Sequence, residues 1–333
     1  MKIIVPMAGR GSRLRPHTLT VPKPLVPVGG KPIVHRLVED IAKTSSEKID
    51  EIAFVIGDFG KEVEDELIRV AEKLGAKGKI FYQDKALGTA HAVLCAAECL
   101  NGSVVVAFAD TLFKADFTLD DDSDGNIWVK QIDDPSAFGV VKLDNDGYIT
   151  DFVEKPETFV SDLAMIGIYY FKKAEKLKVE LQYLIDNGII KSGEYQLPDA
   201  LRRLTEKGLK FTPGKVNEWL DCGNKQVTVH TNQRVLEFDK DKELISKDVV
   251  VENGVIIPPC YIGEHVVIKN SIVGPHVSLG RGTTVKNSVI KNTIVQKNAT
   301  ISNTVLQDSM IGNYAKILSY GKEISIGDYT TIE

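Results

Sequence analysis

Apolar residues in the first 240 positions fall into short runs of strand length, separated by longer stretches with helical spacing. The short runs predict six strands, over Lys2–Pro6, Glu51–Ile56, Lys79–Gln83, Ser103–Ala107, Phe138–Leu143 and Ala164–Phe171. The amphipathic stretches predict helices, among them Pro32–Thr44, Lys61–Leu74, Thr89–Leu100 and Leu197–Lys207. Strands that alternate with helices in this way form right-handed βαβ units. Residues 1–240 are therefore expected to form an α/β domain with a doubly wound, mostly parallel sheet.

A different pattern begins near Val249, where branched apolar residues recur every five or six positions. They stand at Ile262, Ile268, Val273, Leu279, Val285, Ile290, Val295, Ile301, Leu306, Ile311 and Ile317. Small or β-branched residues precede the last ten by two positions, at Val266, Ser271, Val277, Thr283, Ser288, Thr293, Ala299, Thr304, Ser309 and Ala315. A sustained repeat of this length predicts a solenoid over residues 249–333, in which three short strands close each triangular coil.

The corners of such coils require tight bends. Gly263, Gly280, Asn270 and Asn287 stand at these bends and are expected to adopt positive φ. The repeat resembles the left-handed parallel β-helix of hexapeptide-repeat proteins. Antiparallel hairpins packed as a sandwich would instead show period-two alternation and turns about every ten residues.

Composition narrows the class of protein. The chain has 333 residues, of which 43% are hydrophobic, so it can build a sizeable core. A net charge of −5 argues against a protein that binds nucleic acid or a membrane surface. No signal peptide or membrane anchor is recognisable, so the cytoplasm is the expected compartment. The four cysteines form no C-x-x-C motif and are expected to be buried, reduced thiols.

A glycine-rich, basic loop follows the first predicted strand. Gly9 and Gly11 carry no Cβ, so their N–H groups can approach a polyphosphate, while Arg13 and Lys23 supply positive charge. The loop lacks the Gly-Lys-Ser/Thr ending of a Walker A motif, and Leu14 stands where a dinucleotide fingerprint requires a third glycine. An ordinary glycine turn after a strand would share the G-x-G spacing alone.

Two further strand ends carry polar residues. The side-chain amide of Gln83 both donates and accepts, which suits the edge of a nucleobase, and Gly88 permits close approach to the backbone. The alternative is that Gln83 caps a strand end and Gly88 only serves a turn. Asp110 follows a fully apolar strand, where an acid is costly without a cation, and is a candidate metal ligand. The histidines at 17, 35 and 91 are too scattered for a metal cluster, and no Ser-His-Asp arrangement is apparent.

Several motifs recur in one order along the chain. They are G-x-G-x-R-L from Gly9, P-K-P-L from Pro22, F-G-V from Phe138, E-K-P from Glu154, G-I-Y from Gly167 and G-E-Y-x-L-x-D-A from Gly193. Together they resemble the sugar-1-phosphate nucleotidyltransferases, also called nucleotide-sugar pyrophosphorylases, over essentially the entire chain. The Leu87–Val93 segment is most similar to the long thymidylyl- and uridylyltransferases that have a β-helical tail, and differs from the short thymidylyltransferases.

This resemblance implies a role for each matching residue. Arg13, Lys23, Asp110 and Asp221 are expected to be catalytic, the two aspartates holding one Mg²⁺ as cofactor. The residues expected to bind the nucleotide are Ala8, Gly9, Gly11, Gln83, Gly88 and Thr89. Those expected to bind the sugar phosphate are Gly139, Glu154, Lys155 and Tyr169.

The implied reaction joins a nucleoside triphosphate and a sugar 1-phosphate and releases pyrophosphate. We favour dTTP or UTP with glucose 1-phosphate, with GTP and mannose 1-phosphate or ATP and glucose 1-phosphate as the alternatives. A non-catalytic regulatory subunit would have no physical reason to keep the five charged residues Arg13, Lys23, Asp110, Lys155 and Asp221 together. Acyl transfer by the β-helix is disfavoured, since His265 and His276 are its only candidate bases. We also expect a homo-oligomer, with no nucleic acid or membrane partner.

Overall fold

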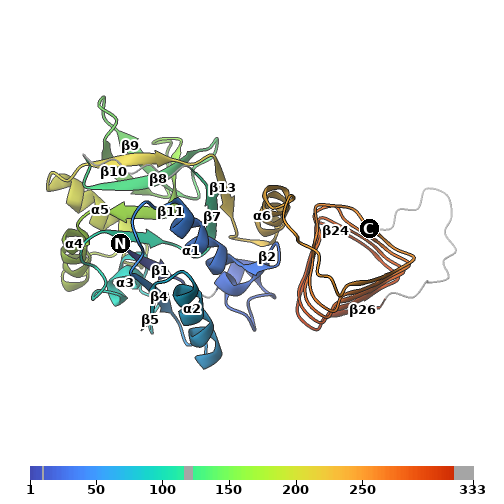
Figure 1. Cartoon of the computed structure of the whole chain (residues 1–333). Coiled ribbons are helices and arrows are strands. Elements are labelled where there is room, and N and C mark those ends of the chain that lie inside the picture. Colours follow the sequence, from blue (N-terminus) through green and yellow to red (C-terminus); the bar gives the residue numbers. More distant parts are fainter. Residues whose placement is uncertain (10, 116–122, 319–333) are drawn as a thin grey trace. The chain divides into compact units, whose positions relative to one another are not determined.

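The computed structural model describes residues 1–9, 11–115 and 123–318 (Figure 1). These residues form two compact units. The first unit comprises Met1–Val26 and Lys31–Gly223, and the second comprises Pro27–Gly30 and the chain from Asn224 onward. No helix within the described ranges is long and apolar enough to cross a membrane.

The first unit is an α/β structure. Its strands are β1 (Lys2–Pro6), β4 (Glu51–Ile56), β5 (Lys77–Tyr82), β6 (Val104–Ala107), β7 (Thr111–Lys114), β8 (Gly125–Gln131), β9 (Gly139–Leu143), β10 (Ile149–Glu154), β11 (Leu163–Phe171), β12 (Phe211–Lys215) and β13 (Glu218–Asp221). Its helices are α1 (Ile33–Thr44), α2 (Lys61–Lys73), α3 (Thr89–Cys95), α4 (Ala174–Asp186) and α5 (Leu197–Glu206). Each of the six predicted strands is present within two residues of its expected ends.

The main sheet has the order β10-β9-β11-β6-β1-β4-β5. Strands β6, β1, β4 and β5 run parallel to one another, so the prediction of a mostly parallel α/β core is confirmed. Ile3, Ile4 and Val5 on β1 are fully buried, which means that both faces of the sheet are covered, as in a doubly wound fold. Beyond β6, β11 pairs antiparallel with β6, β8 and β9 and extends the sheet.

Helix α3 ends earlier than its amphipathic pattern predicts. It stops at Cys95 rather than Leu100. The N–H groups of Ala96, Ala97 and Cys99 donate to carbonyls three residues back, so the helix closes in tight turns. Cys99, Cys222 and Cys260 are buried and Cys95 is half-buried, all as free thiols, in agreement with the sequence.

The second unit contains α6 (Lys225–Phe238) and three parallel sheets. The first sheet contains β14 (Val250–Glu252), β17 (Val267–Lys269), β20 (Thr284–Lys286), β23 (Thr300–Ser302) and β26 (Lys316–Leu318), in that order. The second contains β15 (Val255–Ile256), β18 (Ile272–Val273), β21 (Val289–Lys291) and β24 (Val305–Gln307). The third contains β16 (Tyr261–Ile262), β19 (Ser278–Leu279), β22 (Ile294–Val295) and β25 (Met310–Ile311). Figure 1 shows the three sheets as the three sides of a triangular solenoid, consistent with the left-handed β-helix that the repeat predicts. Val250 pairs with Val267, which in turn pairs with Thr284, so one coil takes 17 residues here.

The predicted inward positions form the interior of this β-helix. Ile268, Val285 and Ile301 are fully buried, whereas Leu306 and Ile311 in the last described coil are only partly covered. The corner prediction is right for the asparagines, with φ of 50° at Asn270 and 46° at Asn287.

The corner prediction is wrong for Gly263 and Gly280, which do not adopt positive φ. A Cβ on Gly263 would lie 2.9 Å from the backbone nitrogen of Arg281, and one on Gly280 would lie 2.6 Å from that of Lys297. These two glycines are therefore needed because the next coil passes too close for a side chain.

Candidate active site

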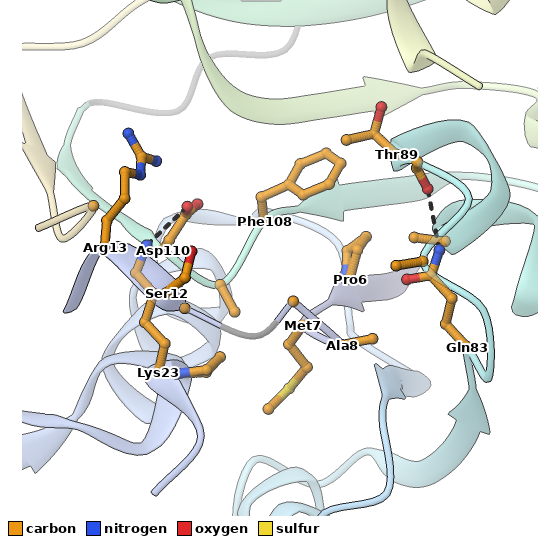
Figure 2. A pocket seen from close by; sticks show the side chains of 18 of the residues that line it. Pro6, Met7, Ala8, Ser12, Arg13, Lys23, Gln83, Thr89, Phe108 and Asp110 are labelled. Atoms are coloured by element: carbon orange, nitrogen blue, oxygen red, sulfur yellow. Dashed lines mark hydrogen bonds and ion pairs between the residues drawn. The ribbon is translucent and has the colours of Figure 1, made fainter. Parts of the chain in front are cut away.

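A cavity of about 350 Å³ lies at the carboxyl ends of β1, β5 and β6 (Figure 2). This volume is within the usual range for small-ligand sites. Nine of the fourteen predicted site residues line it, namely Ala8, Gly9, Gly11, Arg13, Lys23, Gln83, Gly88, Thr89 and Asp110. Figure 2 shows charged side chains gathered at one end and Gln83 and Thr89 at the other, with Pro6, Ala8 and Phe108 between them.

The charged end is built by the glycine-rich loop. Gly11 has φ of 59° and precedes the short 3-10 helix η1 (Ser12–Leu14), on which Arg13 is exposed. A Cβ on Gly11 would lie 2.8 Å from Cβ of Lys23, so the glycine lets Lys23 pack beneath the loop. A Cβ on Gly9 would have nothing within 4 Å, and the backbone there faces open space beside the cavity.

Lys23 and Asp110 form an ion pair at this end. Lys23 lies at the start of the 3-10 helix η2 (Lys23–Leu25) and is only 7% exposed. Its Nζ lies 3.0 Å from Oδ2 of Asp110, which follows β6 (Figure 2). The positive charge of Lys23 offsets the negative charge of Asp110, which would otherwise be unfavourable at the end of an apolar strand.

Main-chain pairing brings Asp221 beside Asp110. Strand β13 pairs antiparallel with β7, which places Asp221 opposite Thr111, and the N–H of Cys222 donates to the carbonyl of Asp110 at 3.0 Å. Burial raises the pKa of Asp221, and the negative charge of Asp110 raises it further. Lys23, the N–H of Gly223 and Arg13 oppose that shift.

The two aspartates provide hard carboxylate oxygens, the ligand type that Mg²⁺ prefers. Among the described residues, no group of three or more His, Cys, Asp and Glu could hold a metal ion. Two carboxylates leave the other positions around a cation to phosphates and water, the ligands that Mg²⁺ takes in nucleotide sites.

The other end contains Gln83, directly after β5, and the loop to α3. Nε2 of Gln83 donates to the carbonyl of Gly88 at 3.1 Å. The hydroxyl of Thr89 accepts from the N–H of Leu197 at 2.9 Å and lies 3.4 Å from Oε1 of Gln196. Thr89 thus lines the cavity, while its hydroxyl is hydrogen-bonded to the start of α5.

The segment before α5 holds this loop in place, a relationship that the sequence did not reveal. Tyr195 donates its N–H to the carbonyl of Leu87 at 2.8 Å and accepts from the N–H of Ala90 at 3.0 Å. A Cβ on Gly88, which has φ of 109°, would lie 2.5 Å from the carbonyl oxygen of Tyr195. The same segment brings Glu194 to the cavity wall. The G-E-Y motif was the available signal, although it gave no role for Glu194.

The four residues predicted to bind the sugar phosphate are not among the described residues that line the cavity. Glu154 ends β10 opposite Gly139 on β9. A Cβ on Gly139 would lie 2.8 Å from Oε2 of Glu154 and 2.4 Å from Cε of Met165, so these side chains fill the space that glycine leaves. Lys155 has φ of 43° and a side chain that is 68% exposed, with its Nζ 4.0 Å from Oε1 of Glu154.

Tyr169 connects this group with the acids of the cavity. It is only 6% exposed, and its ring packs edge-to-face on Phe108, a cavity residue, with the ring centroids 6.2 Å apart. Burial raises the pKa of the phenol, and the charges of Glu154 and Asp110 raise it further. The buried ring of Tyr169 thus links β11 with the cavity wall at Phe108.

Comparisons with known proteins agree with this arrangement. The nucleotidyl transferase family profile matches residues 2–237. The bifunctional protein GlmU of Methanococcus aeolicus is 33% identical over 77% of this chain and 60% of its own length. The low-salt glycan biosynthesis nucleotidyltransferase Agl11 of Haloferax volcanii is 30% identical over 77% of this chain and 71% of its own. The glucose-1-phosphate thymidylyltransferase of Streptomyces antibioticus is 32% identical over 79% of this chain and 73% of its own length.

Solved structures share the fold. A nucleoside-diphosphate-sugar pyrophosphorylase from Vibrio cholerae superposes with a TM-score of 0.58 at 22% identity, over 69% of this chain and 99% of that one. A UDP-glucose pyrophosphorylase bound to UDP-glucose superposes with a TM-score of 0.56 at 22% identity, over 71% of this chain and 98% of that one. This chain spans about 60% of the length of the GlmU relative. Because the family match covers every residue that lines the cavity, the protein belongs to the nucleotidyl transferase family, in agreement with its resemblance to the sugar-1-phosphate nucleotidyltransferases.

Proposed function

We propose that this chain transfers a nucleotidyl group from dTTP or UTP to glucose 1-phosphate and releases pyrophosphate. The observation that carries the proposal is the division of one cavity into an end with the cations Arg13 and Lys23 beside Asp110, and an end with Gln83 and Gly88, where no described lining residue is a cation. A nucleoside triphosphate has the same division, because its phosphates are anionic and its base is neutral.

The reaction is an in-line displacement. An oxygen of the sugar 1-phosphate attacks the α-phosphorus, a new P–O bond forms, and the bond from the α-phosphorus to the oxygen that bridges to the β-phosphate breaks. The attacking phosphate is already anionic, so the reaction needs no general base and no covalent intermediate. Catalysis then depends on position and on charge neutralisation.

The charged residues divide this work. Arg13 is exposed on η1 and can grip the β- and γ-phosphates with its planar guanidinium. Lys23, buried beneath the loop, would contact the α-phosphate, and Lys155 would hold the attacking phosphate. Asp110 and Asp221 would hold Mg²⁺, which when bound neutralises charge that develops on the phosphates.

The choice of substrates rests on two kinds of support. The Leu87–Val93 segment is most similar to long thymidylyl- and uridylyltransferases, and one relative is named as a glucose-1-phosphate thymidylyltransferase. For the sugar side, Glu154 offers a carboxylate that accepts from hydroxyls, and Lys155 beside it offers a cation for the phosphate.

Pyrophosphate release tests the proposal directly. The purified chain is assayed with Mg²⁺ and each of dTTP, UTP, GTP and ATP against glucose, N-acetylglucosamine and mannose 1-phosphates. The highest kcat/KM is expected for dTTP or UTP with glucose 1-phosphate. A best rate with GTP and mannose 1-phosphate, or with ATP and glucose 1-phosphate, would replace the substrates proposed here. Absence of release with every pair would favour a non-catalytic subunit.

A further inference from the structure

The orientation of the Gln83 amide is defined by its surroundings. Nε2 of Gln83 lies 3.1 Å from the carbonyl oxygen of Gly88, which also accepts the N–H of Ala92 (Figure 2). A carbonyl oxygen can only accept, so the NH₂ group of Gln83 must face it. The amide oxygen, Oε1, therefore points away from Gly88, and Gln83 itself lines the cavity.

A second neighbour engages the same NH₂ group. Nδ1 of His91, on α3, lies 3.1 Å from Nε2 of Gln83. Since the amide nitrogen is a donor, Nδ1 must accept, which places the imidazole proton on Nε2 of the ring. Burial lowers the pKa of His91 and so favours this neutral form. Sγ of Cys95 lies 3.8 Å from the same Nδ1, and burial raises the pKa of that thiol, which keeps it uncharged.

We propose that His91 is a positioning residue for nucleobase selection, acting through Gln83. With one N–H bound to Gly88 and the other to His91, Gln83 presents Oε1 to the base as a fixed acceptor. A base with a ring N–H at its Watson–Crick edge, such as thymine, uracil or guanine, supplies the matching donor, whereas cytosine and adenine have no ring hydrogen there. This inference rests on the proposed function and deepens it.

The geometry separates this role from direct binding. Gln83 lines the cavity and His91 contacts its amide, so we assign the effect of His91 on a ligand to the position of Gln83. If His91 no longer accepted, one N–H of Gln83 would lose its partner and the amide would be held by Gly88 alone. The amide could then turn more easily and present a donor in place of an acceptor, which weakens the preference for a ring N–H.

The test is steady-state kinetics of single and double variants. His91→Leu removes the acceptor, whereas His91→Asn keeps one, since Oδ1 of asparagine occupies nearly the position of Nδ1. His91→Leu should raise the KM for dTTP or UTP about fivefold, the effect of one buried hydrogen bond, and lower the ratio of kcat/KM for these nucleotides over CTP. The KM for the sugar 1-phosphate should stay unchanged. His91→Asn should restore most of the nucleotide KM, and His230→Leu, at an exposed histidine of α6, serves as the matched control.

The double variant isolates the coupling. In a Gln83→Ala background, His91→Leu should change neither the nucleotide KM nor the base ratio, because the group that it positions is gone. The proposal would be overturned if His91→Leu changed the nucleotide KM as much in that background as in the wild type. It would also be overturned if His91→Leu raised the KM for the nucleotide and for the sugar 1-phosphate equally, or if His91→Asn did not restore the nucleotide KM. If His91→Leu does not fold, His91→Ala removes the same acceptor and is compared with wild type and in the Gln83→Ala background in the same way. If the wild type turns over and the His91 variants have the same nucleotide KM and base ratio, only the role of His91 is rejected. If the wild type does not turn over, the proposed function itself is rejected.

Discussion

Nζ of Lys23 lies 3.0 Å from Oδ2 of Asp110, which joins the loop after β1 to the loop after β6 at the charged end of the cavity. The two residues are far apart in sequence, and each is positioned by a different neighbour. Lys23 packs under Gly11, and the carbonyl of Asp110 accepts from the N–H of Cys222. An ammonium and a carboxylate thus lie at the same point of the cavity, where the proposed function places phosphate and metal.

Replacement of Asp110 by asparagine should abolish turnover. The change keeps the size of the side chain but removes the charge on which a Mg²⁺ site depends. We expect kcat to fall at least about 100-fold, the usual scale for losing one charge-stabilising group, and the Mg²⁺ concentration for half-maximal rate to rise. Initial rates of pyrophosphate release over a Mg²⁺ titration measure both quantities. Asp241→Asn, at an exposed aspartate, is the control, and a loss below threefold at Asp110 would contradict the assigned role.

Replacement of Lys155 by alanine should weaken binding of the sugar phosphate. Its side chain is 68% exposed, so the change should barely affect stability. We expect the KM for glucose 1-phosphate to rise about tenfold through loss of a charge-assisted contact, with the KM for the nucleotide within twofold. Lys142→Ala, at an exposed lysine of β9, controls for loss of surface charge. Equal changes in both KM values would argue against a specific role on the sugar side.

Glu154→Gln should give a pH-dependent gain in stability. Burial raises the pKa of the Glu154 carboxyl above 4.5, the charges of Asp199 and Glu194 add to this shift, and Lys155 and Lys191 oppose it. Because the folded chain holds this proton more tightly than the unfolded chain does, stability falls as pH rises from the ordinary pKa through the raised one. The variant has no proton to lose, so at about pH 7 its Tm should exceed that of the wild type by about 1–3 °C.

The Tm difference for Glu154→Gln should disappear below about pH 4.5, where the wild-type carboxyl is protonated in both states. The KM for glucose 1-phosphate should rise at neutral pH, because a neutral amide is a weaker acceptor than a carboxylate. Thermal unfolding at both pH values, together with initial rates, checks the prediction. The same Tm difference at acid and neutral pH would show that ionisation is not its cause.

Two glycine substitutions should separate packing from ligand binding. A methyl group at Gly9 would meet nothing within 4 Å, so Gly9→Ala should leave Tm within about 2 °C while it raises the nucleotide KM at least about tenfold. Gly88→Ala should lower Tm as well, since its Cβ would collide with the carbonyl of Tyr195 in a left-handed backbone. Calorimetry paired with kinetics checks both, and Gly102→Ala, at a positive φ with open space, measures the effect of backbone strain alone.

Asn232→Ala should destabilise the second unit. The side chain is fully buried and accepts from the N–H of Gly29 at 2.8 Å and from the hydroxyl of Ser278 at 2.7 Å, and it donates to the carbonyl of His276 at 3.3 Å. Loss of these partners should cost about 2–4 kcal/mol of unfolding free energy. Chemical denaturation measures this, with His230→Ala on the exposed face of α6 as the control. A cost below about 0.5 kcal/mol, the size of an ordinary surface substitution, would show that water replaces the amide.

The sequence predicted the fold well because the strand-forming runs and the short repeat are strong local signals. It indicated the glycine-rich loop that lines the cavity because Gly9, Gly11 and Arg13 follow directly after a buried strand. The pairing of β7 with β13 could not be predicted, since both strands are short and their residues lie far apart in sequence. Only the resemblance to a family suggested that Asp221 accompanies Asp110.

Other features depended on contacts that a sequence pattern does not encode. Gly139 was expected to bind the sugar phosphate, and the structure adds that a Cβ there would meet the carboxylate of Glu154. Positive φ was expected at Gly263, whereas the close approach of Arg281 explains the glycine there. In each case a neighbour from a distant segment determines which residue fits.

The two-stranded ribbon of β7 and β13 has a consequence for how this enzyme class can vary. Backbone hydrogen bonds between the two strands hold the two aspartates in register. Within the segment between them, the turn at 144–148 joins β9 to β10 and can change in length without moving the ribbon's ends. Under the proposed function, variation there would alter the side that receives the sugar phosphate while the pair of aspartates keeps its place.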